Sequence, residues 1–325
     1  MKASSRIVLF TFFEFLNKGI PFLLLPILTR FLTPSGYGNI ASFLMLVSFS
    51  AIFIGLSGHG AIDANYYRMS RKRLAKYISN VIVVLFSSFL VLLVVVLLLN
   101  HLITNLTGVS FNWQIFALVV SLCQFITVIN LTLWVIEKQP VRYGFYQTTQ
   151  TALFGSISIL AVVVLHKQWQ GHLVALSLSA ISFGLLSLYF LYKRNYLKLS
   201  FKKLYIKDFL HFGIPMLPHQ LGDWFRNQGD KLIILTFIGS SGMGLFAVGQ
   251  QISMVMLILI TSLNRALYPS LFSILSTNPT LADKRKVVLK SYLIALGVIL
   301  LSVIAIILIA IVYAFLLGTQ FQSIM

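Results

Sequence analysis

The chain has 325 residues, of which 58% are hydrophobic and only 10% are charged, and its formal net charge is +18. Soluble domains carry about 25% charged residues, so this composition excludes a soluble globular protein. Apolar runs such as 81–99 are long enough to cross a bilayer as helices. The single cysteine, Cys123, excludes an internal disulfide. The sequence therefore predicts an all-α integral membrane protein.

Nine membrane-crossing helices are predicted in chain order. Gly, Pro and charged residues interrupt the apolar runs and mark the connections between helices. Residues 33–38 are expected to form a tight turn, and the basic segment 58–80 a loop that includes a partly amphipathic helix at the membrane surface. The predicted helices cover residues 7–32, 39–57, 81–102, 114–136, 145–165, 173–192, 212–238, 245–271 and 287–317.

Lysine and arginine are distributed unevenly over the predicted connections. If the N-terminus is inside, 19 of the 25 basic residues fall in inside segments, and only Lys167 falls in an outside loop. The positive-inside rule explains this asymmetry, so the net charge does not indicate a nucleic-acid partner. The charge distribution instead predicts a cytoplasmic N-terminus in a multi-pass membrane protein, with anionic membrane lipids as partners of the basic loops.

Two short motifs recur in the same order. Gly19-Ile20-Pro21 returns 194 residues later at Gly213, and Ser35-Gly36-Tyr37-Gly38 returns 206 residues later at Ser241. Because the copies are an even number of crossings apart, they run in the same direction, which indicates a parallel repeat about an axis along the membrane normal. The period predicts a six-helix lobe at 1–200 and a second lobe at 201–325. With about three helices, the second lobe is expected to be incomplete, as in a fragment or a truncated chain.

Charged residues cluster in the two predicted helices that the repeat relates. Ionisable groups within a spanning helix are costly, and they usually face a bundle interior or a water-filled cavity. Glu14 precedes Lys18 by one helical turn, and Asp223, Arg226 and Asp230 share one helix face. This pattern favours a charged cavity between the lobes. The alternative is that these charges neutralise each other and fix helix packing.

Four amide side chains add a weaker signal in the predicted helices at 114–136 and 145–165. Amides in apolar helices hydrogen-bond a polar ligand or join one helix to another. The six histidines are scattered at segment ends and predict no metal site, and no motif indicates a cofactor. The candidate cavity-lining amides are Gln124, Asn130, Gln147 and Gln150.

Three segments carry a resemblance to a known family. FLTPSGYG ends the first predicted helix, FGIPMLPHQLGDWFRNQGDKLII opens the seventh, and SSGMGLFAVG follows it. With these segments the chain resembles the polysaccharide repeat-unit (O-antigen type) flippases of the multidrug/oligosaccharidyl-lipid/polysaccharide exporter superfamily. The resemblance implies a two-lobed bundle of about twelve helices in the bacterial inner membrane, and the last three helices are absent here.

The resemblance also implies a substrate and residue roles. Such a flippase moves undecaprenyl-diphosphate-linked oligosaccharide by alternating access, for surface polysaccharide or lipopolysaccharide synthesis, beside the polysaccharide polymerase and chain-length machinery. Asp230 matches the acidic residue late in the family's seventh helix. Basic groups would meet the diphosphate, and acidic groups would bind a coupling ion. The predicted substrate contacts are Lys18, Arg226 and Lys231, and the predicted ion-coupling residues are Glu14, Asp223 and Asp230.

Two other classes of function compete with this interpretation. A cation-coupled multidrug exporter of the same superfamily would carry organic cations and would need a net acidic cavity, but the two charged helices offer three acids and, with Arg30 at a helix end left aside, three bases. A polysaccharide polymerase or glycosyltransferase would need a large outside loop or a cytosolic catalytic domain, and the sequence predicts neither. A transporter, and not an enzyme, is therefore expected.

Overall fold

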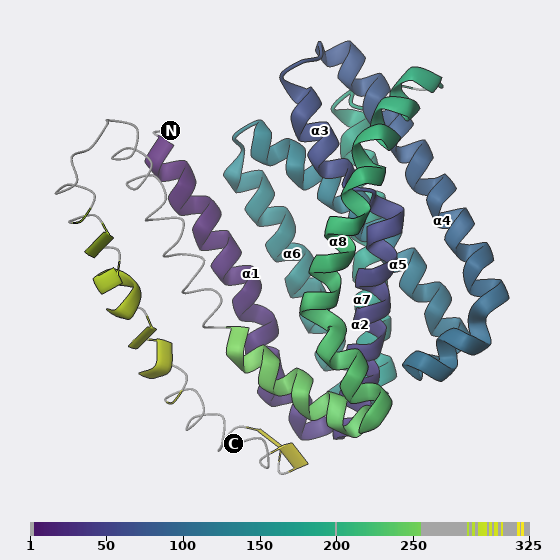
Figure 1. Cartoon of the computed structure of the whole chain (residues 1–325). Helices are drawn as coiled ribbons and strands as arrows, with labels where there is room; N and C mark the ends of the chain where they lie inside the picture. The colour runs from purple at the N-terminus through teal and green to yellow at the C-terminus, as the bar shows by residue number, and fades with distance from the viewer. Residues whose placement is uncertain are drawn as a thin grey trace. The chain divides into compact units, whose positions relative to one another are not determined.

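The computed structural model describes residues 3–198, residues 200–254 and short stretches between 285 and 321, with side chains from Leu9 onward. These residues form helices joined by short connections and include no strand, which confirms the predicted all-α class (Figure 1). Residues 240–254 form a helix that follows the last labelled one. The labelled elements are α1 (Ala3–Phe31), α2 (Pro34–Gly55), α3 (Gly58–Tyr66), α4 (Arg71–Thr107), α5 (Phe111–Ile136), α6 (Pro140–Ile159), the π-helical η1 (Leu160–Val164), α7 (Gln168–Lys193) and α8 (Lys203–Phe237).

Six helical spans in the described part of the chain are long and apolar enough to cross a membrane. They correspond to the first six predicted crossings and comprise α1, α2, α4, α5, α6 with η1, and α7. Helix α8 was predicted as the seventh crossing but is not among them, because polar and charged residues interrupt its apolar sequence. The crossings predicted at 245–271 and 287–317 lie largely outside the described residues, so the number nine is not confirmed.

The connection between α1 and α2 is shorter than predicted. Residues 33–38 were expected to form a turn, but α2 already begins at Pro34. The Thr33 hydroxyl accepts a hydrogen bond from the Gly36 N–H at 3.1 Å, and proline is favoured at a first helical position because it lacks an N–H to satisfy. The prediction was wrong because it took Pro34 as a helix breaker when it is part of a helix start.

The basic segment 58–80 is also more regular than expected. It contains α3 and the first turns of α4, joined at Tyr67–Ser70. Leu56 and Ser57 adopt left-handed backbone angles, with φ of 45° and 53°, and turn the chain from α2 into α3. Helix α4 has 37 residues and is therefore roughly 55 Å long, which exceeds a hydrocarbon core of about 30 Å. Its basic start can thus project beyond the bilayer.

Helices α2, α5 and α7 pack at the centre of the bundle through small residues. A Cβ atom added to Gly184 of α7 would lie 2.7 Å from the Cβ of Cys123 on α5. A Cβ atom on Gly55 of α2 would overlap the ring of Phe125, also on α5. Because lipid chains are as apolar as the helix surfaces, close van der Waals packing of this kind is what associates membrane helices. Cys123 is thus a small residue at a helix contact.

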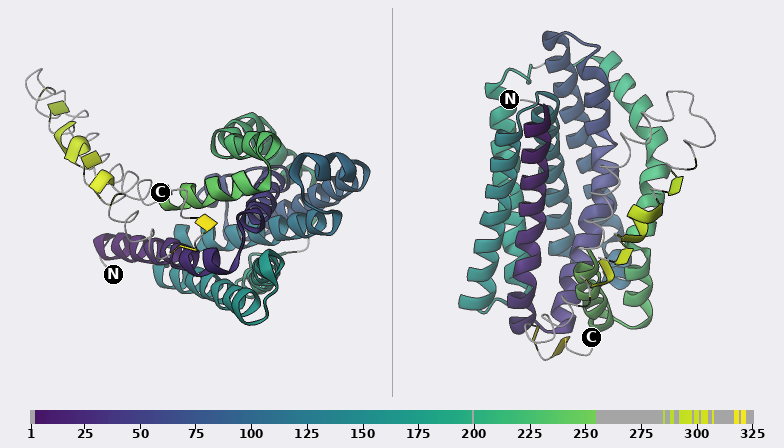
Figure 2. Two further views of the ribbon diagram at one scale, coloured as in Figure 1. Left: turned by 90° about the horizontal axis from the view of Figure 1, so that it is seen from below. Right: turned by 90° about the vertical axis from the view of Figure 1, so that its left-hand side faces the viewer.

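The two predicted charged helices lie on different flanks of this centre (Figures 1 and 2). Helix α1 packs against α6 and η1, and the ring of Phe13 occupies the space that a side chain at Gly144 would fill. Helix α8 packs against α2, α3 and α4, with Phe209 fully buried and Gly213 directly against the backbone carbonyl of Leu56.

The chain divides into two compact units, residues 1–244 and residues 245–325. Helix α8 belongs to the first unit, whereas the repeat placed the lobe boundary near residue 200. Superposition of one repeat on the other would require residues outside the described ranges. The division into lobes at 1–200 and 201–325 therefore stays a prediction.

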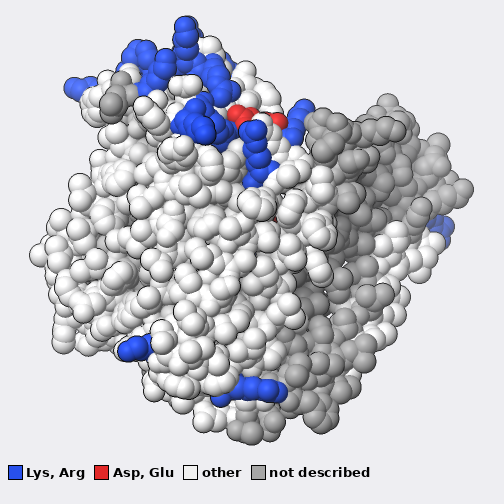
Figure 3. Space-filling view, turned by 180° about the vertical axis from the view of Figure 1, so that it is seen from behind, with Lys and Arg blue, Asp and Glu red and all other residues white. Residues whose placement is uncertain are grey.

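Basic side chains gather at one end of the first unit. The α3–α4 junction and the α7–α8 junction lie at this end (Figure 1). On the face shown in Figure 3, lysine and arginine crowd this end and are sparse elsewhere. Segments that are separate in the sequence thus form one basic surface, as the positive-inside rule requires of loops on one side of a membrane.

Candidate functional site

Helix α8 has an inner face that fixes its rotation against the bundle. The Trp224 indole N–H donates to the Ser48 hydroxyl of α2 at 3.0 Å, and the Gln220 amide donates to the Ser57 hydroxyl at 2.6 Å. Phe209, about three to four turns earlier in α8, is buried in the main apolar core. These contacts determine which side chains of α8 point away from α2.

A neighbouring, exposed side of α8 carries the predicted charged stripe of Asp223, Arg226 and Asp230. Arg226 Nη2 lies 3.0 Å from Asp223 Oδ1, and His219 Nε2 lies 3.5 Å from Asp223 Oδ2. The Arg226 side chain is 74% exposed and that of Asp223 is 48% exposed. Asp230 is exposed one turn further on, and Lys231 Nζ donates to the side chain of Gln228 at 2.9 Å. The structure therefore brings four of the six predicted charged residues onto one helix.

An exposed charged face on a helix of a membrane protein indicates contact with water or with another protein surface. Charged groups in contact with lipid chains are costly, so they face a water-filled cavity or another protein surface. Exposed apolar side chains cover much of the rest of the bundle, and Leu90 of α4 is 58% exposed. The contrast makes α8 the element of the first unit best suited to border a hydrated path.

Helix α1 places the other two charged candidates beside α6. Glu14 is half-buried and Lys18 is exposed. Between them the sequence interpretation overlooked Asn17, which is 8% exposed. Its amide nitrogen donates to the Thr148 hydroxyl at 3.3 Å, and its amide oxygen accepts from the Thr151 hydroxyl at 3.0 Å. The signal was available, since a buried amide in an apolar helix implies a partner on a neighbouring helix.

Two of the four candidate amides share a small pocket. Gln124 of α5 and Gln150 of α6 line a cavity of about 120 Å³ together with Thr151 and Ser179. Since liquid water occupies about 30 Å³ per molecule, this space suits a few waters and is too small for an oligosaccharide. Gln147 lies one turn before Thr151 on α6, and its side-chain oxygen is buried with no hydrogen-bond partner among the described residues.

Asn130, the fourth amide, belongs to a different cluster. It is fully buried, and its side-chain oxygen accepts from Arg194 Nη1 at 2.8 Å. Arg194 also forms an ion pair with Glu137, whose other oxygen accepts from the Tyr196 hydroxyl. The guanidinium of Arg71 lies 4.5 Å from the centre of the Tyr196 ring. This cluster links α4, α5 and the end of α7, so Asn130 serves helix packing here, and its role in a cavity stays a prediction.

The charged groups of this cluster are buried and paired with each other, as expected for groups that hold helices together. The side chains of Glu137 and Arg194 are only 12% and 14% exposed. Burial raises the pKa of Tyr196, and the hydrogen bond to Glu137 raises it further, so the phenol keeps its proton and remains a donor. In the described part of the chain, no three His, Cys, Asp or Glu side chains are grouped so that they could hold a metal ion.

Comparison with known proteins places the chain in a family. Residues 6–275 match the family described as polysaccharide biosynthesis protein, and the chain belongs to this family. A membrane protein of Haemophilus influenzae described as uncharacterized is 28% identical over 273 residues, which is 80% of this chain and 62% of that protein. The Lsg locus putative protein 1 of Haemophilus influenzae is 27% identical over 286 residues, or 85% and 67% of the two chains. The chain thus spans about two thirds of these relatives.

Solved transporter structures share the fold at low sequence identity. An inward-facing multidrug resistance MATE family transporter of the MOP superfamily superposes with a TM-score of 0.69 at 15% identity, covering 100% of this chain and 78% of that one. A MOP superfamily transporter from Pyrococcus furiosus, described as having a binding pocket of reverse polarity, superposes with a TM-score of 0.61 at 18% identity. The match covers 98% of this chain and 75% of that one. The protein is therefore a multi-pass membrane protein of the polysaccharide biosynthesis family, and it shares its fold with transporters of the MOP superfamily.

Proposed function

We propose that the chain is part of a flippase that moves lipid-linked oligosaccharide across the membrane, with the outer face of α8 bordering the path of the head group. Membership of the polysaccharide biosynthesis family supports a sugar-containing substrate. The exposed charges of α8 carry the proposal, because a diphosphate-linked head group needs both water and basic groups during its passage. Arg226 and Lys231 supply these groups on α8, and Lys18 supplies one on α1.

The acidic residues give this path a candidate switch. Asp223 is held by Arg226 and His219, whereas Asp230 is exposed one turn beyond Arg226. A carboxylate that gains and loses an ion between two conformations can couple transport to an ion gradient, because the ion biases one conformation over the other. We assign this role to Asp230 first, with Asp223 and Glu14 as further candidates.

Transport in cells tests the proposal, with the full gene product expressed in a bacterium that makes a surface polysaccharide. Asp230→Asn keeps the side-chain shape and Arg226→Gln keeps a polar side chain, and each removes the charge. Both variants should accumulate in the membrane at the wild-type level and should abolish export of the polysaccharide. Arg142→Gln, which removes an exposed arginine outside the candidate set, controls for a general effect of altered charge and should leave export unchanged. Normal polysaccharide with both variants would show that the α8 charges are not required.

A multidrug exporter of the same superfamily is the second candidate, because the similar solved structures include MATE family transporters. An organic cation would need a net acidic site, whereas the two acidic residues of α8, Asp223 and Asp230, are balanced in number by Arg226, which pairs with Asp223, and by the half-buried Lys231. Expression in a drug-sensitive strain separates the two candidates. Resistance to cationic drugs that is lost with Asp230→Asn, without any effect on polysaccharide, would favour the exporter.

The membrane and its orientation belong to the same proposal. The basic end of the first unit is assigned to the cytoplasmic side of the bacterial inner membrane, which places the N-terminus in the cytoplasm. The polysaccharide polymerase and chain-length machinery are the expected protein partners on the opposite side, where the flipped substrate would be used.

A further inference from the structure

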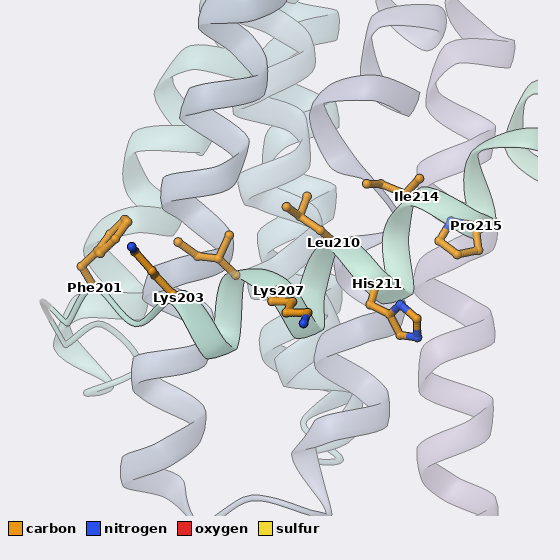
Figure 4. Close-up of a pocket in the computed structure, with 8 residues that line it drawn as sticks. Phe201, Lys203, Lys207, Leu210, His211, Ile214 and Pro215 are labelled. Atoms are coloured by element: carbon orange, nitrogen blue, oxygen red, sulfur yellow. The ribbon is translucent and has the colours of Figure 1, made fainter.

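Helix α8 carries a second feature, distinct from the charged stripe around Arg226. A groove of about 500 Å³ follows its first turns, from the residues just before the helix to Pro215. Figure 4 shows Lys207 and His211 on one flank of the helix and Leu210 and Ile214 on the other. The groove therefore has lysines at its start and along one side, where Lys203 points towards Phe201 and Lys207 points away from it, and apolar side chains along the other side.

The basic flank is suited to an anion. Lys203 and Lys207 are exposed and one helical turn apart, with backbones separated by about 6 Å along the axis. Neither lysine forms an ion pair in the described part of the chain, and the first turn of α8 contains no acidic residue. Asp208, the nearest acid in the sequence, accepts a hydrogen bond from Asn65 of α3 at 3.4 Å and does not line the groove. Two lysines near a helix N-terminus also add to the partial positive charge of that helix end, and a bound anion would reduce the repulsion between these charges.

The apolar flank extends in the direction of the membrane interior. Ile206, Leu210 and Ile214 recur every four residues and form one stripe along α8. The helix starts at the basic end of the bundle and descends towards its middle (Figure 1). Residues 203–214 rise by roughly 16 Å, about half of a hydrocarbon core of about 30 Å. The apolar stripe is thus about as long as one leaflet of the bilayer is thick, and the lysines lie at the surface of that leaflet.

We propose that this groove binds an anionic membrane phospholipid, with the phosphate between Lys203 and Lys207 and one acyl chain along Ile206, Leu210 and Ile214. A free phosphate ion would not explain the apolar flank. A lipid-linked sugar would need amide or hydroxyl groups, and none of the described side chains that line the groove supplies one. The site is independent of the proposed function, because a flippase and a drug exporter would both be embedded in such lipids.

Lipid binding to the purified full chain tests the proposal by native mass spectrometry. Phosphatidylglycerol should bind, and the double variant Lys203→Gln/Lys207→Gln should bind it about ten- to thirtyfold more weakly, given the usual contribution of each surface lysine to anionic lipid binding. The matched control is Lys72→Gln/Arg73→Gln, which removes the same charge from the exposed start of α4 at the same end of the bundle. The control should bind phosphatidylglycerol as the wild type does.

Further arms of the experiment identify the occupant. Phosphatidylcholine with the same acyl chains should bind more weakly than phosphatidylglycerol, and Leu210→Gln should weaken phosphatidylglycerol binding without changing the net charge. An equal loss of phosphatidylglycerol binding in the groove variant and in the α4 control would overturn the proposed site. Binding of inorganic phosphate through Lys203 and Lys207, without binding of phosphatidylglycerol, would overturn a lipid occupant. Binding of a polyprenyl diphosphate through Lys203 and Lys207, without binding of phosphatidylglycerol, would overturn the choice of a bulk phospholipid.

Discussion

Gly38 and Gly244 meet where the start of α2 crosses the helix at residues 240–254. A Cβ atom added to Gly244 would lie 2.8 Å from the Gly38 nitrogen and would overlap the Pro34 carbonyl oxygen, and one added to Gly38 would overlap the Ser240 carbonyl. These glycines end the two Ser-Gly-x-Gly motifs, so the similar motifs pack against each other. A repeat axis passing between two copies would bring equivalent segments together in this way, and the repeat itself stays a prediction.

The crossing predicts a sharp sensitivity to one added methyl group. Gly38→Ala or Gly244→Ala must force the two backbones apart, and overpacking of this kind costs about 1–3 kcal/mol. Thermal unfolding of the purified protein in detergent should occur at a lower temperature for either variant. The control is Gly222→Ala in α8, where no neighbouring atom lies within 4 Å and alanine favours the helix. If Gly222→Ala lowers the unfolding temperature as much as Gly244→Ala does, the close backbone packing at the crossing is not the cause of the destabilisation.

Hydropathy was sufficient to predict the six crossings in the first part of the chain. Their cores are long apolar runs, which have few alternatives in a bilayer. Helix ends were predicted less well, because they depend on local hydrogen bonds. Thr33 caps α2 through its side chain, so Pro34 begins a helix where composition suggested a turn. The charged stripe of α8 could also be predicted, since helical periodicity alone places Asp223, Arg226 and Asp230 on one face.

The buried pair of Glu137 and Arg194 could not be predicted in the same way. The two residues are 57 positions apart, and each appeared as an ordinary member of a charged loop. They meet only because α5 and α7 pack side by side and end at the same level. The contact of Asn130 with Arg194 could not be predicted for the same reason: a buried amide needs a partner, but the sequence does not say whether that partner is a ligand or Arg194.

Removing one member of this pair should destabilise the protein strongly. Glu137→Gln leaves Arg194 buried without its counter-charge, and breaking a buried pair from one side costs about 3–5 kcal/mol. Chemical denaturation in detergent should show this loss for either single variant and a smaller loss for Glu137→Gln/Arg194→Gln together. Arg142→Gln, which removes an exposed arginine bonded to Gln139, provides the control. Additive losses in the double variant would contradict a direct coupling.

The charge asymmetry predicts which ends of the helices lie outside the cell. In a Cys123→Ser background, a membrane-impermeant thiol reagent added to intact cells should modify Asn105→Cys and Lys167→Cys. It should modify Arg73→Cys only after the membrane is opened. All three positions are exposed, so burial does not account for a difference between them. The reverse labelling pattern would invert the proposed orientation.

The central claim is that the charged face of α8 meets water within the membrane, and thiol accessibility along α8 tests it most directly. In the Cys123→Ser background, Arg226→Cys and Asp230→Cys should react rapidly with a small charged thiol reagent in native membranes. Phe209→Cys is fully buried and should not react, and Leu90→Cys, exposed on the apolar surface of α4, should also remain unmodified because lipid excludes a charged reagent. If Arg226→Cys and Asp230→Cys are as unreactive as Leu90→Cys, α8 does not border a hydrated path and the proposed function loses its basis.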